Sequence, residues 1–328
     1  MNTYNKSIKK NSISSIMLEV ILALIPAILC MIYFYGISYI IIISNSVICA
    51  ILSEYLFLKA KGYPNPSIVI KLKDLSAVVT AILLSLCMPP DIPWYILSFG
   101  TIFAIVIVKQ LYGGLGQNIF NPAMVGYCVL LISFPALFAS WPVTDNIKSF
   151  NLNFESSYSQ RYDSISSATP LETIKSQTKN NQSITSIKES NPNIFSAWFV
   201  INLSYLLGGL YLILRKIIKP YPSLSFLISM GLLAAIFSSI WPEIYPNLLT
   251  TLFTGSTMIA AFFIVTDPVT MPASFINKII YTAAIAALTY IIRTFAGYPD
   301  GVAFAVILMN ATVPLLDKIN IPKPFGVN

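Results

Sequence analysis

One threonine stands out chemically because small residues surround it. The run Asp163-Ser164-Ile165-Ser166-Ser167-Ala168-Thr169-Pro170-Leu171 lies in a stretch rich in Ser, Asn, Thr and Lys. The hydroxyl of Thr169 can form a phosphoester, and a modifying enzyme needs an accessible, extended segment with small neighbours such as Ser166 and Ala168. The alternative is an ordinary polar loop in which this threonine has no chemical role.

Carboxylates in or beside apolar segments form a second group of candidates: Glu19, Glu54, Asp267 and Asp317. Charged groups in a bilayer are costly and often mark ion pathways, so each is a candidate for ion translocation. The alternative is that the side chain reaches the lipid headgroups at a helix end, which we favour for Glu54 and Asp317.

Several classes of site are excluded by residue types alone. The chain contains no histidine, which excludes histidine-ligated haem, histidine-based zinc sites and a Ser-His-Asp triad. The net charge is +7, but no basic stripe interleaved with surface aromatics is present, so we expect no nucleic-acid binding. The cysteines fall in apolar stretches without Cys-x-x-Cys spacing and are interpreted as packing residues: Cys30, Cys49, Cys87 and Cys128.

The elements that position these groups are predicted to be membrane helices. Hydrophobic residues make up 56% of the 328 residues and charged residues 10%, whereas a soluble domain carries about a quarter charged residues. No small-residue cleavage site follows the first apolar run, so we expect it to stay in the membrane. A span needs about 20 apolar residues. We predict an all-α integral membrane protein of about ten spans, near 16–35, 37–58, 75–88, 94–109, 123–140, 195–214, 222–240, 246–265, 276–292 and 301–316.

The distribution of Lys and Arg predicts the orientation of these spans. With the N-terminus inside, 14 of the 20 Lys and Arg residues fall in inner segments, and five of the other six lie in the long 141–194 loop. Because long loops translocate largely regardless of charge, this bias predicts that both termini are cytoplasmic and that 141–194 is periplasmic.

The chain divides into a first five-helix repeat at 1–140, an external polar loop at 141–194 and a second five-helix repeat at 195–328. Residues 122–131 align with 299–308, where Pro, Val, an aromatic residue, Val and Leu recur in register, and 87–91 aligns with 265–269. Five spans per half place equivalent elements on opposite sides of the membrane, so the pattern indicates an inverted repeat with broken segments. Coincidence between two apolar runs is the alternative.

These residues resemble a known family. The run from Tyr112 to Tyr127, Tyr-Gly-Gly-Leu-Gly-Gln-Asn-Ile-Phe-Asn-Pro-Ala-Met-Val-Gly-Tyr, is similar to a stretch of the NqrB/RnfD family, the membrane subunits of Rnf (Rsx) complexes and of the sodium-pumping NADH:quinone reductase. Further resemblance lies in 91–94, 255–270 and 298–305, and the Gln-Asn and Met-Val-Gly-Tyr details favour the Rnf branch.

The resemblance implies a covalent flavin. The family attaches flavin mononucleotide (FMN) to a threonine in a motif resembling Asp-Gly-x-Ser/Thr-Gly-Ala-Thr, which Asp163, Ser166, Ala168 and Thr169 match. Ser164 and Ser167 stand where glycines are usual, and the 193–198 segment replaces a Gly-Ser-Ile-Gly-Glu-like stretch. Candidate cofactor-binding residues also lie in the Tyr112–Tyr127 run: Gly113, Gly114, Asn118 and Asn121.

The resemblance further implies a relay subunit of a bacterial inner-membrane redox-driven ion translocase, without a complete active site of its own. Its implied partners are the iron–sulfur, flavin and membrane subunits of the complex and a flavin transferase. We hypothesise that the chain breaks frame a second flavin site, for example for riboflavin, or a sodium or proton path that includes Asp267, Asp300 and Glu19. The rival functions are a channel or secondary transporter without a redox role, and a purely structural scaffold.

Overall fold

The computed structural model describes residues 12–139, 141–142, 166–167, 169–180 and 182–319. Almost all of its regular structure is helical, so the predicted all-α membrane protein is confirmed. Five helices in this part of the chain are long and apolar enough to cross a membrane: α1 (Ile13–Tyr35), α2 (Ser38–Ala60), α11 (Pro192–Leu214), α12 (Pro220–Ile240) and α15 (Phe275–Phe295). Their outer faces carry many exposed large apolar side chains, as a lipid-facing surface requires.

The other apolar segments are shorter or interrupted. In the first half these are α4 (Ser76–Leu86), α5 (Trp94–Ile102), which continues as the π-helix η1 (Phe103–Gln110), and α6 (Pro122–Ser133), followed by α7 (Pro135–Ala139). In the second half α13 (Leu248–Phe253), α14 (Thr257–Ile259) and the π-helix η3 (Ala260–Ile264) follow one another, and α16 (Val302–Ile319) ends the described chain. A short helix, α3 (Asn65–Leu72), joins α2 to α4.

Chain breaks lie where proline and glycine interrupt the apolar pattern. α4 ends at Leu86, directly before Cys87-Met88-Pro89-Pro90, and α6 begins at Pro122, whose missing N–H suits the first helical position. The Asn121 side chain caps α6 by accepting a bond from the N–H of Met124 at 3.2 Å. Between η1 and α6 the backbone turns at Gly113, Gly114 and Gly116, all with positive φ.

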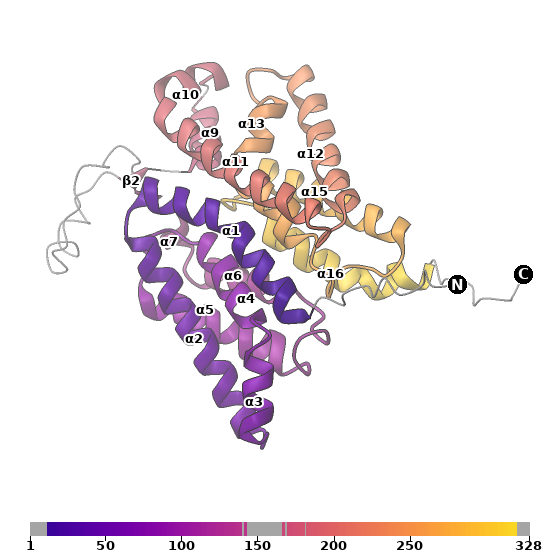
Figure 1. The fold of residues 1–328 in the computed structure, drawn as a ribbon. Helices are drawn as coiled ribbons and strands as arrows, with labels where there is room; N and C mark the ends of the chain where they lie inside the picture. The colour runs from indigo at the N-terminus through magenta and orange to yellow at the C-terminus, as the bar shows by residue number, and fades with distance from the viewer. Residues whose placement is uncertain (1–11, 140, 143–165, 168, 181, 320–328) are drawn as a thin grey trace, which may run out of the picture.

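The two halves of the chain form two helix groups that meet along a shared face (Figure 1). The first helix of one half, α1, packs on the first helix of the other, α11, and the fifth apolar segments, α6 and α16, also touch. Within each half the second helix packs on the fourth segment, α2 on α5 and α12 on α15. This one pairing therefore recurs in both halves, as a two-fold repeat would require.

The polar loop contains more structure than its composition predicts. It holds α9 (Pro170–Lys179) and α10 (Ile184–Ser190), and α11 already begins at Pro192. Apolar side chains of α9 and α10, such as Leu171 and Ile187, are buried. The expectation of a weakly ordered segment is therefore wrong for 169–180 and 182–190, because these short helices bury an apolar face against the membrane helices.

The contact between α1 and α11 depends on a glycine. A Cβ atom at Gly208 would lie 2.1 Å from the backbone oxygen of Ala23, so α11 approaches the α1 backbone more closely than any side chain allows. Small residues permit this approach between membrane helices. A Cβ at Gly231 of α12 would meet only ordinary contacts, the nearest being 3.4 Å away.

We expect Gly208→Ala to destabilise the protein by about 1–3 kcal/mol, the usual cost of overpacking a rigid contact. Thermal unfolding of the detergent-purified protein measures this as a lowered midpoint. Gly231→Ala is the matched control, since it adds the same methyl group to a helix without a clash. Equal midpoints for the two variants would contradict the close α1–α11 approach.

Candidate functional site

Thr169 is the N-cap of α9. Its backbone is extended, with φ −60° and ψ 158°, and its hydroxyl oxygen accepts a bond from the N–H of Glu172 at 3.3 Å. The side chain is 9% exposed, which corrects the expectation of an accessible segment. Because a capping oxygen acts only as an acceptor, its hydrogen is not needed for the cap. The hydroxyl hydrogen can therefore be replaced by a phosphoryl group while the cap is kept.

Two tryptophans lie near this threonine. The strands β1 (Trp141–Pro142) and β2 (Ser166–Ser167) pair antiparallel, and Trp141 lies opposite Ser167, two residues before Thr169. The Trp141 ring meets that of Trp198 on α11 edge to face, with centroids 5.4 Å apart. Aromatic pairs of this geometry form rigid walls. The ladder therefore places an aromatic wall beside the capping threonine.

Thr169 opens onto a cavity between the two halves of the chain, with about 750 Å³ of empty space including its open side. Concave, largely apolar spaces with a few polar groups are typical of small-molecule and cofactor sites. The lining is mostly apolar and aromatic and comes from α1, α4, α6, α7, β1, α9, α11, α14, η3, α16 and their connections: Met31, Leu86, Cys87, Met124, Tyr127, Phe138, Trp141, Thr169, Leu171, Trp198, Tyr205, Gly255, Ser256, Ile259, Ile264, Pro299, Asp300, Val302 and Ala303.

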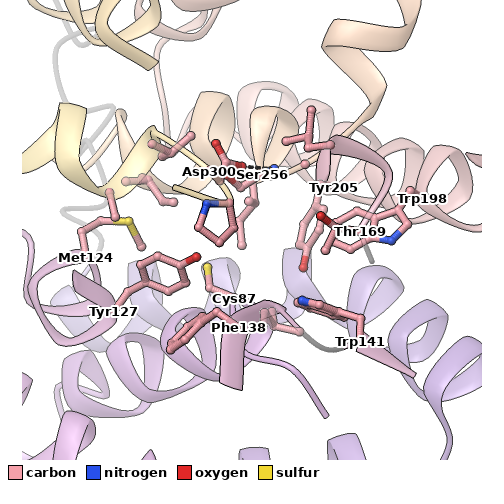
Figure 2. Close-up of a pocket in the computed structure, with 18 of the residues that line it drawn as sticks. Cys87, Met124, Tyr127, Phe138, Trp141, Thr169, Trp198, Tyr205, Ser256 and Asp300 are labelled. Carbon is pink, nitrogen blue, oxygen red and sulfur yellow. Dashed lines mark hydrogen bonds between the residues drawn. The ribbon is translucent and has the colours of Figure 1, made fainter. Parts of the chain in front are cut away.

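Figure 2 shows how the labelled side chains surround this space. Thr169 and the two tryptophans stand at one end, and Met124, Tyr127 and Phe138 stand at the other. The cavity thus has one end that carries a modifiable hydroxyl and another that is lined by Met124, Tyr127 and Phe138.

Asp300 is held on the cavity wall by a dense set of bonds. The Arg293 guanidinium binds it in a bidentate manner, at 2.9 and 3.1 Å from Nη2, and the Ser256 N–H and hydroxyl donate to its Oδ2. The Gly301 N–H donates to Oδ1 at 2.6 Å. Burial acts to raise the pKa of the Asp300 carboxyl, but Arg293 and Ser256 outweigh it, so the pKa lies below its usual value and the carboxylate stays ionised.

α9 is fixed against this same region. The Lys175 ammonium donates to the backbone oxygens of Ala296 and Tyr298, and Leu171 fills the space where a Cβ of Gly255 would lie. Burial raises the pKa of the Glu172 carboxyl, with Lys175 acting in the opposite direction. A carboxyl that is more readily neutral repels an anion at the start of α9 less strongly.

Comparison with known proteins assigns a family. The family model described as "NQR2, RnfD, RnfE family" matches residues 5–326. The chain belongs to this family. It is 40% identical to the D-type subunit of the ion-translocating oxidoreductase complex of Psychromonas ingrahamii, over 97% of this chain and 96% of that protein. Proteins with the same name from Yersinia pseudotuberculosis serotype O:1b, at 41% identity, and Escherichia coli strain SE11, at 40%, cover 97% and 95% of this chain and 95% and 94% of their own lengths.

The flavin motif predicted from the family resemblance lies only partly in the described chain. Asp163 and Ala168 fall outside the described residues, and Ser166 pairs with Pro142 in the β-ladder. Thr169 lines the cavity. Within the described part of the motif, Thr169 lines the cavity and Ser166 does not, and the other lining residues come from other elements.

The candidates of the glycine-rich run lie apart from Thr169. None of Gly113, Gly114, Asn118 and Asn121 is among the described residues that line its cavity. The N–H of Asn121 donates to the Asn310 side chain on α16. Asn118 is 6% exposed, and its Oδ1 has no partner in the described chain. These residues therefore do not line the cavity, although Asn121 binds the N–H of Met124, which does.

The three carboxylates predicted to form one ion path lie in different networks. Glu19 on α1 binds Arg215 and Tyr211 at the end of α11. Asp267 accepts from the Val269 N–H and the Thr270 hydroxyl. Asp300 faces the Thr169 cavity instead.

The headgroup interpretation is wrong for Glu54. Its side chain is 2% exposed and binds the Lys109 ammonium, also 2% exposed, at 2.6 Å. The orientation prediction counts Lys109 among the inner cations, but this lysine lies in η1 and is buried. Asp317 accepts from the Ala273 N–H at an exposed position, which agrees with a place at a helix end.

Sequence patterns do not identify several of the residues that shape the site. Tyr205 and Trp198 look like ordinary apolar positions of α11, and Arg293 counts as an outer cation in the orientation prediction although it is only 5% exposed. An arginine seven residues before Asp300, near Pro299 and Gly301, is the one available signal, because a buried carboxylate needs a cation.

Proposed function

We propose that the chain is the D-type membrane subunit of an ion-translocating oxidoreductase complex and relays electrons through FMN bound covalently to Thr169. Relatives whose sequences match this chain over almost their full length carry that subunit name. The observation that carries the flavin assignment is the position of Thr169, a capping threonine at the rim of an aromatic cavity. Bound flavin exchanges electrons one or two at a time, and covalent attachment keeps it in place.

The start of α9 suits the phosphate of FMN. Backbone N–H groups and the helix dipole favour an anion at a helix N-terminus. Pro170 has no N–H to offer, which leaves the N–H groups of Leu171 and Glu172 nearest to Thr169. The phosphoester oxygen keeps accepting the Glu172 bond at this position.

The cavity suits the isoalloxazine ring system. Trp141, Trp198 and Tyr127 supply flat walls, and most of the other lining side chains are apolar. One polar atom on the wall, the Tyr205 hydroxyl, is buried without a partner in the described chain, as expected where a ligand supplies the missing contact. The residues present therefore fit the group.

We also propose that electron transfer through this subunit is coupled to sodium or proton movement. Asp267 is the best-placed carboxylate, since no Lys or Arg of the described chain forms an ion pair with it. Asp300 and Glu19, by contrast, are paired with arginines. The region of Gly113, Gly114, Asn118 and Asn121 remains our candidate for the second site, which would hold a flavin such as riboflavin or the ion, because the unpartnered Asn118 oxygen offers a contact there.

We further propose that the protein lies in the bacterial inner membrane with both termini cytoplasmic and the 141–194 segment periplasmic. Lys71 and Lys73 at the C-terminal end of α3 support this orientation, because α3 and the α9–α10 pair lie at opposite ends of the molecule (Figure 1). The proposed partners are the iron–sulfur, flavin and membrane subunits of the complex, and a flavin transferase that attaches the FMN.

Attachment requires access to a nearly buried hydroxyl, so we infer that the transferase acts before α9 docks.

Protein produced with its maturation enzyme should fluoresce under ultraviolet light on a denaturing gel. The tryptic peptide that contains Thr169 should carry the added mass of FMN less one water. A non-fluorescent band and an unmodified peptide would contradict the flavin relay and favour a channel, a transporter or a scaffold.

A further inference from the structure

The hydroxyl of Tyr205 is buried without a hydrogen-bond partner in the described chain. Tyr205 is 3% exposed and lies on α11, where its ring meets that of Phe263 edge to face at 6.2 Å. A buried polar atom is seldom left unpaired, because it has lost its bonds to water without replacement. Its position therefore calls for an acceptor that the described chain does not supply.

The cavity provides the place for that acceptor. Tyr205 is one of its lining residues, and its ring stands beside Thr169 and Trp198 (Figure 2). The other strongly polar group on the wall, Asp300, is an acceptor and is already bound by Arg293 and Ser256. Tyr205 is therefore a wall residue whose buried hydroxyl has no partner in the described chain.

We propose that Tyr205 donates a hydrogen bond to the flavin ring and thereby raises its reduction potential. This inference rests on the proposed attachment of FMN to Thr169. Reduction adds electron density to the acceptor atoms of the ring, so a fixed donor in a low-dielectric site binds the reduced ring more strongly than the oxidised ring. Packing against Phe263 holds the donor in place.

The test is a dithionite titration of purified, covalently flavinylated protein, followed by the flavin absorbance against a reference dye. Tyr205→Phe removes only the hydroxyl and keeps the aromatic packing. We expect its equilibrium constant for two-electron reduction to fall about tenfold, which lowers the midpoint by about 30 mV. The absorption band of the oxidised flavin should shift in the same variant, because the ring loses a polar contact.

Tyr290→Phe is the matched control. Tyr290 is also 3% exposed, but it does not line the cavity. Its removal should leave the potential and the absorption band unchanged. A fluorescent Tyr205→Phe protein with the wild-type potential and band would overturn this inference alone. Wild-type protein without covalent flavin would overturn the proposed function as well, so the two failures are distinguishable.

Discussion

Thr169→Val is expected to leave the protein without covalent flavin, with gel fluorescence reduced to background. Valine has the shape of threonine but no hydroxyl, so no phosphoester can form. Electron transfer through the assembled complex should be lost with it, because a relay needs its redox group at a fixed place. Fluorescence that survives in this variant would show that the flavin is attached elsewhere.

Loss of the helix cap is a second consequence of the same change and has to be separated from loss of attachment. Thr169 caps α9, and removing a capping side chain costs about 1 kcal/mol. Thr169→Asn keeps a good capping side chain without a hydroxyl, whereas Thr169→Ser keeps both. We expect no flavin in the asparagine variant and retained flavin in the serine variant. Thr178→Val, on the same helix but outside the cavity lining, should be flavinylated normally.

The membrane helices are predictable because lipid imposes a simple rule on the chain. Backbone groups in the bilayer must be paired internally, so long apolar runs become helices. Proline and glycine then mark where such runs stop, as at Met88-Pro89-Pro90 after α4 and at Asn121-Pro122 before α6. The π-helical geometry of η1 has no comparable sequence signal, because it depends on packing around the segment.

The polar loop shows where composition misleads. Its Ser, Asn, Thr and Lys content indicates little structure, yet Thr169 and Ser183 each cap a helix. The Thr-x-x-Glu pattern formed by Thr169 and Glu172 is a helix-start signal present in the sequence. The average composition of the loop hides this helix-start signal, because two short helices need only a few apolar residues to pack against the membrane helices.

The cavity itself could not be predicted from the sequence. Its walls come from elements as distant along the chain as Met31, Trp141 and Asp300, and only the meeting of the two halves brings them together. Thr169 is found by resemblance of a local motif, which needs no knowledge of packing. The fold alone brings Tyr205 and Arg293 to the site, so no local sequence motif identifies them.

The buried ion pair between Glu54 and Lys109 leads to the second large expected effect. The Lys109 ammonium also donates to the Ser76 hydroxyl at 2.7 Å, and Gln110 donates to the same Glu54 oxygen. Glu54→Leu leaves the ammonium buried without its counter-charge. Removing one partner of such a pair typically costs about 3–5 kcal/mol, because an uncompensated charge remains inside.

The double variant Glu54→Leu/Lys109→Met should recover much of this loss, since replacing both charges by apolar groups is often close to neutral. Thermal unfolding of the wild type, both single variants and the double variant gives the coupling energy of the pair. Glu19→Leu is the control, because its partner Arg215 is 58% exposed and water can solvate it, so only a small change is expected. A double variant as unstable as the sum of its single variants would show that the two charges do not act as a pair. Strong coupling would mean that Lys109 serves to hold η1 against α2 and α4, so the ion path should then be sought near Asp267 instead.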